Sequence, residues 1–111
     1  MAARGNAASP FSRKVIFICK TDGTVVKTSC RASVEVAFEE KYRIGIANAF
    51  DGEDGATHGY WLAYESERRW GRADGTAPPN FPTFEAWLET VETIDLQIES
   101  SPFNAGALAT P

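Results

Sequence analysis

Residues 60–70 of the chain read YWLAYESERRW, and they include four hydrophobic residues in a row, WLAY at residues 61–64. Successive residues of an α-helix point about 100° apart, so a helix over this stretch is apolar on nearly all sides at that turn. Such a helix has to be covered from several directions. We therefore expect it to form the centre of the core, and we expect Gly71, just after its charged half, to end it.

Length and composition indicate one globular domain. The chain has 111 residues, of which 43% are hydrophobic and 23% charged, so it can form a core of its own. The net charge of −4 argues against nucleic acid or an anionic membrane as partner, because both require a basic patch. No apolar run approaches the ~20 residues that span a bilayer, and the N-terminal MAARGNAASP lacks the apolar region of a signal peptide. We expect a soluble cytoplasmic protein.

Two β-type stretches, residues 13–20 and 24–31, flank an Asp-Gly pair at residues 22–23, which is a strong hairpin signal. A lone hairpin is marginally stable in water, so it has to pack on helices, pair with a third strand or pair with another copy. We expect it to cover the helical core. Its apolar strand edge near Ile16 and Ile18 is a candidate site of self-association.

The same hairpin allows a test of disulfide formation. With a two-residue turn, Cys19 faces Val26 and Cys30 faces Val15. The two thiols then share one face but lie roughly 13 Å apart along the ladder, at ~3.3 Å per residue. A disulfide needs Cα atoms within about 7 Å. The sequence therefore predicts two free thiols.

Helical patterns follow the hairpin. A first helix is expected over residues 34–42 with Ser33 as its cap, and a shorter piece over residues 46–50. Thr57 is expected to cap the central helix. Residues 71–82, rich in Gly and Pro, then interrupt the helical pattern.

Residues 83–99 show the most regular amphipathic pattern of the chain. Thr83 is suited to cap a helix there, with Glu85 in the first turn. Apolar residues recur at i, i+3, i+4 and i+7, and acidic residues occupy the opposite side. The stripe consists of Phe84, Trp87, Leu88, Val91, Ile94 or Asp95, and Ile98.

Together these patterns predict an α+β fold, with an N-terminal β-hairpin packed on a small bundle of three to four helices. Residues 13–99 form the single domain on this interpretation. Residues 1–12 are expected to be a disordered tail and residues 100–111 a flexible C-terminal tail.

Catalytic and metal-binding sequence patterns are missing. His58 is the only histidine and has no Ser or Cys nucleophile beside it in sequence, so we expect a surface or boundary histidine. The turn DGEDG at residues 51–55 does not place ligands at the positions of a calcium loop, and the cysteines and histidine are too few for a structural zinc site. Gly-rich phosphate motifs do not occur. We expect no enzymatic activity, no cofactor and no metal.

Three tryptophans are candidates for the core or for an interface. Trp61 and Trp87 fall on apolar stripes and are expected in the core. Trp70 lies at the charged end of the central helix and is the best interface candidate, because tryptophan is a frequent anchor of protein interfaces. The two arginines before it are expected to pair with Glu65 at i−3 and i−4.

Four segments in this order carry a resemblance: TDGT at residues 21–24, VEVAFEEKYRIGI at 34–46, THGYWLAYESERRWG at 57–71 and FPTFEAWLETVETID at 81–95. The sequence resembles the small tail assembly chaperones of tailed bacteriophages, especially those that infect Gram-positive hosts. In that family a segment like AFEEKYRIGI precedes an aromatic helix, and an acidic helix like FEAWLETVE closes the domain. The resemblance covers roughly residues 13–99, and the long Gly/Pro-rich linker departs from the family pattern.

The resemblance implies a non-enzymatic protein of the host cytoplasm that coats the coiled-coil tape measure protein before the tail tube polymerises around it. It also implies self-association, the tail tube protein as a further partner, and a longer form made by translational frameshifting. No nucleic acid or membrane takes part. On this interpretation the predicted partner contacts are Trp70, Arg69, Trp87, Val91, Ile16 and Ile18.

Two other functions fit the same acidic, aromatic sequence. One is a structural virion protein, such as a head–tail connector or a capsid accessory protein, which would be found in purified particles. The other is an acidic phage inhibitor of a host protein, which would use its acidic helix as a nucleic-acid mimic. Tight binding to a basic host protein would favour the latter.

Overall fold

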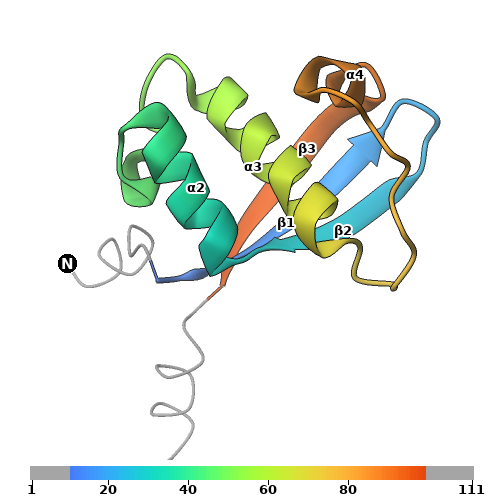
Figure 1. Ribbon diagram of the computed structural model, residues 1–111, viewed down its shortest axis with the longest axis horizontal. Coiled ribbons are helices and arrows are strands. Elements are labelled where there is room, and N and C mark those ends of the chain that lie inside the picture. Colours follow the sequence, from blue (N-terminus) through green and yellow to red (C-terminus); the bar gives the residue numbers. More distant parts are fainter. Residues whose placement is uncertain (1–10, 100–111) are drawn as a thin grey trace, which may run out of the picture.

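The computed structural model describes residues 11–99. The tail predicted for residues 1–12 falls mostly outside these described residues, and the tail predicted for residues 100–111 falls wholly outside them. In chain order the elements are β1 (Arg13–Lys20), β2 (Val25–Cys30), α2 (Ala32–Tyr42), the short 3₁₀ helix η1 (Ile46–Asn48), α3 (Gly55–Trp70), α4 (Phe84–Leu88) and β3 (Val91–Glu99) (Figure 1).

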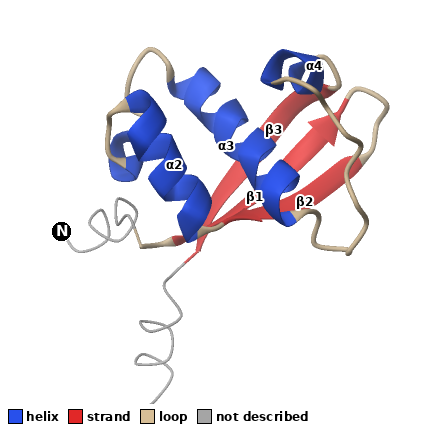
Figure 2. Cartoon of the chain, viewed as in Figure 1, coloured by secondary structure: helices blue, strands red, loops and turns tan. Residues whose placement is uncertain are grey.

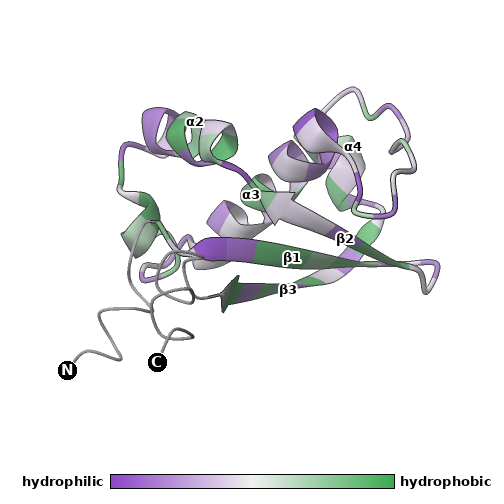
Figure 3. Ribbon diagram, turned by 90° about the horizontal axis from the view of Figure 1, so that it is seen from below, coloured by the Kyte–Doolittle hydropathy of each residue, from purple (hydrophilic) through white to green (hydrophobic). Residues whose placement is uncertain are grey.

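The strands form one antiparallel sheet in the order β2-β1-β3, so β1 is the central strand. Helices α2, α3 and α4 all lie on one side of this sheet (Figure 2, Figure 3). Side chains alternate between the two faces of a strand, and Ile16 and Ile18 of β1 belong to the core with no exposed surface. The predicted α+β class is confirmed. The sheet has a third strand in addition to the hairpin.

The helix predicted for residues 83–99 is wrong beyond its first turns. α4 ends at Leu88, and the following residues form β3, which pairs with β1. Ile94 and Ile98 lie four positions apart, a spacing that fits one face of a helix and also one face of a strand. Leu96 distinguishes the two, because it would face away from both isoleucines on a helix but shares their side in a strand. The β-branched residues of this stretch also favour a strand.

The hairpin register differs from the prediction by one residue. Cys19 pairs with Val25 and Cys30 with Lys14, because the loop has three residues and ends at Gly23, whose φ is 94°. A shift by one residue moves a side chain to the other face of the sheet. The two cysteines therefore lie on opposite faces, and Cys30 is the one in the core. Both thiols are free, as predicted.

α3 is the centre of the core, as residues 61–64 predicted, and all four of these residues are buried. On one side Trp61 packs against Phe38 of α2, with ring centroids 6.2 Å apart. On the other side Tyr64 packs against Trp87 of α4, with centroids 5.7 Å apart. The aromatic helix therefore joins the two ends of the helical layer.

Two of the predicted helix starts are wrong, and one is confirmed. Arg31, not Ser33, precedes α2, and α3 begins at Gly55, before the predicted Thr57. Thr83 does cap α4, because its Oγ1 accepts a hydrogen bond at 3.1 Å from a backbone N–H of the first turn. None of the helices within residues 11–99 is both long enough and apolar enough to cross a membrane.

Candidate functional site

The structure places three of the six predicted contact residues in the interior. Ile16 and Ile18 lie in the central strand, so the exposed edge expected there is wrong, because β3 pairs with that side of β1. Trp87 is buried as well, and its Nε1 donates a hydrogen bond to Glu67 at 2.9 Å. In this fold these three side chains offer no surface to a partner.

The other three lie nearer the surface but not together. Val91 is the first residue of β3 and is partly buried. Arg69 lies at the exposed end of α3, where its Nε donates to Glu65 at 2.8 Å. Arg68 pairs with the same carboxylate at 2.6 Å, so the predicted pairing of both arginines with Glu65 is confirmed.

Trp70 is exposed at the C-terminal end of α3. Its ring is held in place by Ser33 of α2 and by Arg31, the residue that precedes α2. Its Nε1 donates to the Ser33 Oγ at 3.0 Å. The guanidinium carbon of Arg31 lies 4.4 Å from the ring centroid, within the range of a cation–π contact. The ring is therefore fixed before any partner arrives, which lowers the entropic cost of binding.

An apolar surface follows β3. β3 pairs with β1 on one side and has no strand on its other side within residues 11–99. Its apolar residues face the helices without being fully covered: Ile94 and Leu96 are partly buried, and Ile98 is 43% exposed. Phe50, beside them, is 38% exposed. We call Phe50, Ile94, Leu96 and Ile98 the β3 strip.

Gly59 of α3 brings the β3 strip close to the helix. A Cβ at this position would lie 3.4 Å from Cδ1 of Ile94 and 3.6 Å from Cε1 of Phe50. Both residues thus pack over the bare backbone of α3. The other face of β3 is polar, with Thr93, Asp95 and Gln97 exposed, and Glu92 is exposed at the irregularity where the register between β1 and β3 shifts. The edge therefore presents an apolar side and an acidic side.

A second feature lies near the hairpin turn, where charged groups are buried together. The Glu67 carboxylate, only 1% exposed, accepts a hydrogen bond from Nε of Arg72 at 2.7 Å and one from Nε1 of Trp87. The Lys20 ammonium lies 3.6 Å from the same carboxylate. We call Lys20, Glu67, Arg72 and Trp87 the Glu67 cluster. It joins β1, α3 and α4 to the connection between the last two.

Lys20 has an unusual environment for a lysine. Its Nζ lies 5.2 Å from the ring centroid of Trp87 and 5.4 Å from that of Phe81, and 3.4 Å from Oγ1 of Thr90. Burial lowers the pKa of Lys20 below its ordinary value; the Glu67 carboxylate opposes this effect and Arg72 adds to it.

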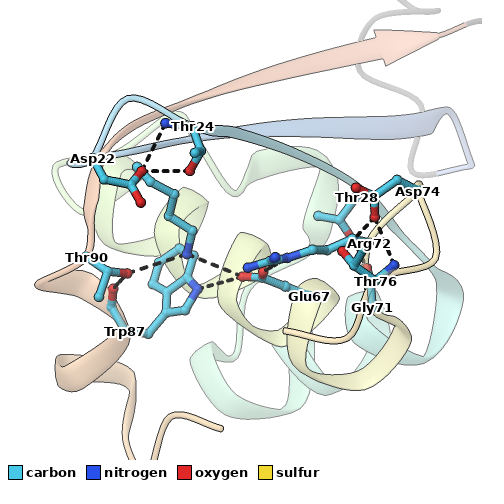
Figure 4. Close-up of polar contacts among 11 residues, drawn as sticks. Asp22, Thr24, Thr28, Glu67, Gly71, Arg72, Asp74, Thr76, Trp87 and Thr90 are labelled. Carbon is cyan, nitrogen blue, oxygen red and sulfur yellow. Dashed lines mark hydrogen bonds and ion pairs between the residues drawn. The ribbon is translucent and has the colours of Figure 1, made fainter. Parts of the chain in front are cut away.

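A cavity of about 1070 Å³ adjoins this cluster, between the hairpin turn and the connection from α3 to α4. Its lining includes both cations of the cluster and the apolar residues Val25, Val26, Pro79 and Phe81. Asp22 and Asp74 also line it, and each belongs to an Asp-Gly-Thr turn. In both turns the aspartate accepts hydrogen bonds from the N–H and Oγ1 of the threonine two residues on (Figure 4).

Sequence reasoning missed the Glu67 cluster, although a signal was present. Glu67 follows Tyr64 by three positions and Ala63 by four, so it lies on the buried face of the central helix. A carboxylate on the apolar face of a helix needs a buried cation as its partner. Lys20, the last residue of β1, is such a cation, 3.6 Å from Glu67.

His58 is buried, which differs from the expected surface or boundary position. Its Nδ1 lies 2.6 Å from the carbonyl oxygen of Ala49. Its ring makes edge contacts with Phe38 and Tyr42, at centroid distances of 5.1 and 4.7 Å. These contacts give His58 a packing role between α2 and α3. In the part of the chain that the structure describes, no group of three or more His, Cys, Asp or Glu residues could hold a metal ion.

Comparison of the chain with known protein families, with curated proteins and with solved structures finds no match in any of the three.

Proposed function

We propose that this chain is a non-enzymatic assembly protein of the tail assembly chaperone kind that its sequence resembles, and that it holds a segment of the tape measure protein along the β3 strip. The open edge of β3 is the observation that carries the proposal. This strand is nine residues long, and no other strand of residues 11–99 pairs with its outer side. Its apolar side chains remain partly exposed.

An open strand edge and an apolar strip together suit a protein partner. The unpaired backbone groups of an edge strand can bond an added segment, while pockets between its side chains select the residues of that segment. Covering the exposed parts of Phe50 and Ile98 would contribute about 1–2 kcal/mol each, at ~25 cal/mol per Å² of apolar area. One such contact is weak. Many copies of the chain bound along one elongated partner would together bind strongly, and each copy could still dissociate singly because its own contact is weak.

The charge of β3 favours a particular partner segment. Glu92 and Asp95 are exposed beside the apolar residues, so a segment with lysine or arginine next to its apolar positions would fit best. A second copy would fit poorly, because antiparallel pairing about Asp95 would place two carboxylates opposite each other. Self-association, which the resemblance also implies, would then use another surface.

The experiment is co-purification of the chain with tape measure protein fragments. Ile98→Asp puts a charge into the β3 strip and should lower the amount of fragment captured at least about tenfold, because an unpaired carboxylate would have to be buried. Val36→Asp is the matched control, since Val36 is 54% exposed on α2, away from β3. It should capture as much as the unchanged chain. Thermal melts of both variants show whether the fold persists.

Further variants separate the location of the site from the function. Trp70→Ala and Val91→Ala test the surfaces predicted from sequence. If Trp70→Ala abolishes capture and Ile98→Asp does not, the β3 strip is the wrong surface. The tape measure protein would then remain the proposed partner, bound through Trp70. If the unchanged chain captures no tape measure fragment, the proposed function is wrong. Presence of the chain in purified particles would favour a structural virion protein instead.

A further inference from the structure

The Glu67 cluster buries more positive than negative charge. It holds two cations, Lys20 and Arg72, against the one carboxylate of Glu67. The side chain of Lys20 is 8% exposed and that of Arg72 is 20% exposed, so water hydrates the excess charge poorly. An excess cation in such a position is stabilised by an additional anion.

Both cations have hydrogen-bond donors that the described residues do not use fully. Charge-assisted N–H···O bonds are about 2.7–2.9 Å long. The Lys20 ammonium approaches Glu67 only to 3.6 Å and the Thr90 hydroxyl only to 3.4 Å. Arg72 uses its Nε toward Glu67, and within residues 11–99 no hydrogen bond engages the terminal nitrogens of its planar fork.

The adjoining cavity has room for the rest of a ligand. Its volume of about 1070 Å³ is slightly above the range for small-molecule sites, roughly 300–1,000 Å³. Phe81 and Pro79 line one part of it and Val25 and Val26 another. A ring-sized apolar group would find aromatic and aliphatic contacts there while its charged end reached the two cations.

The carboxylates of the lining limit the charge that the ligand can carry. Hydrogen bonds from Thr24 lower the pKa of Asp22, and hydrogen bonds from Thr76 lower the pKa of Asp74. Both stay ionised near neutral pH and repel anions. Lys27 also lines the cavity, so the three cations Lys20, Lys27 and Arg72 are balanced by the three carboxylates of Asp22, Glu67 and Asp74. Such a balance favours a monoanion over a dianion such as a phosphate monoester.

We propose that this cavity binds a monocarboxylate with an apolar, ring-bearing body, whose carboxylate is held by Lys20 and Arg72 and whose ring packs against Phe81. This site is separate from the β3 strip and does not depend on the proposed partner. Two kinds of molecule carry these groups: a free aromatic acid, and a peptide that ends in an aromatic residue with a free C-terminal carboxylate.

Binding is measured by NMR titration of the ¹⁵N-labelled full chain with 3-phenylpropionate, its amide and phenyl phosphate. We expect shifts with the carboxylate at the N–H groups of Thr21, Thr24, Ala73 and Thr76, which line the cavity. The amide should cause none, and phenyl phosphate should bind more weakly. Equal shifts with acid and amide, shifts elsewhere, or no binding would each overturn the proposal.

Two peptides distinguish the sources of the carboxylate. One is an acetylated tetrapeptide that ends in phenylalanine with a free carboxylate, and the other is the same peptide with a C-terminal amide. Binding of the free-acid peptide alone supports a peptide C-terminus as the ligand. Binding of 3-phenylpropionate without either peptide supports a free acid.

Two variants test the assignment of the charges. Lys20→Met should weaken binding of 3-phenylpropionate at least about tenfold, because it removes a charge-assisted contact. Asp74→Asn lies at an exposed turn and is expected to keep the fold. It should strengthen binding of phenyl phosphate about twofold at low salt, because it removes one repelling charge. Weaker phenyl phosphate binding in Asp74→Asn would contradict the role given to the turns, even if Lys20→Met failed to fold.

Discussion

The β3 strip leaves apolar side chains open at one end of the sheet, whereas the Glu67 cluster buries charged groups at the other end. Lys14 of β1 pairs with Ile98 of the strip, and Lys20, at the opposite end of β1, belongs to the cluster. Polarity alone would assign these regions the reverse exposure. The difference in burial follows from which part of the chain each region fixes in place.

The cluster helps to hold a connection without regular structure, whose start is also hydrogen-bonded to β2: Thr28 Oγ1 donates to the carbonyl oxygen of Gly71, and the Ala73 N–H donates to that of Lys27. Residues 71–82 contain no helix or strand, and Glu67 bonds one residue on each side, Arg72 and Trp87. Ordering such a segment costs backbone entropy that a few directed, charge-assisted contacts can offset. β3 is already held by its ladder to β1, so the fold does not require its outer side chains to be covered.

The largest effect is expected from Glu67→Gln, which keeps the shape of the side chain and removes its charge. Lys20 and Arg72 would then be buried without a counter-charge, and the free energy of unfolding should fall by about 3–5 kcal/mol. Glu65→Gln is a matched control on the same helix, since Glu65 is also buried but its partners Arg68 and Arg69 are exposed. Its loss should stay below ~1 kcal/mol. Urea denaturation measures both, and equal losses would contradict a special role for the cluster.

The parts of the fold that could be predicted are those set by neighbours in sequence. The hydrophobic run at residues 61–64 identified the central helix, and the Asp-Gly pair at residues 22–23 identified the hairpin. β3 was missed because Ile94 and Ile98 satisfy both the helical and the strand period. Its pairing with β1 joins residues about 80 positions apart in the chain, which a local pattern does not report.

The errors in the candidate site follow from that missing strand. Ile16 and Ile18 could be placed on an open edge only while β1 had one neighbour; with β3 beside it, β1 is central and they are core residues. The open edge belongs to β3 instead, and its exposed residue Ile98 was expected on the apolar stripe of a helix. The position of Trp70 at the surface could be predicted because it depends only on where α3 ends.

A smaller effect is expected from the buried thiol of Cys30. Burial raises the pKa of the Cys30 thiol from 9.0 to about 12, and Glu35 adds to the rise. Above pH 9 the unfolded chain loses this proton while the folded chain keeps it, so unfolding releases a proton and stability falls as pH rises. Well above pH 9 the loss should approach about 1.4 kcal/mol per pH unit, which gives roughly 1.6 kcal/mol between pH 9 and 10.5.

Cys30→Ala isolates this effect. Lys20 and Tyr42, whose pKa values are also shifted, are present in both proteins, so the difference between the two pH profiles reports the thiol. The profile of Cys30→Ala should be flatter above pH 9 in chemical denaturation. Parallel profiles would mean that the thiolate is accommodated in the fold, and that the interior at β2 is more polar than its burial indicates.

The smallest effect concerns the packing beneath the β3 strip and has the opposite sign. Gly59 lies inside α3, where glycine costs roughly 0.5–1 kcal/mol relative to alanine. The added methyl of Gly59→Ala would meet Ile94 at 3.4 Å and Phe50 at 3.6 Å, close to ordinary contact distances. Stability should therefore rise by about 0.5–1 kcal/mol, and capture of tape measure fragments should not change.

Gly59→Leu is the variant to compare with Gly59→Ala. Its larger side chain has no room between α3 and β3, so it would push Ile94 and Phe50 outward and lower stability by about 1–3 kcal/mol. If the β3 strip binds the partner, capture should fall together with stability in this variant, although no residue of the strip has been replaced. Loss of capture in Gly59→Ala as well, without loss of stability, would mean that binding needs Phe50 to move against the helix, and that the strip is not preformed.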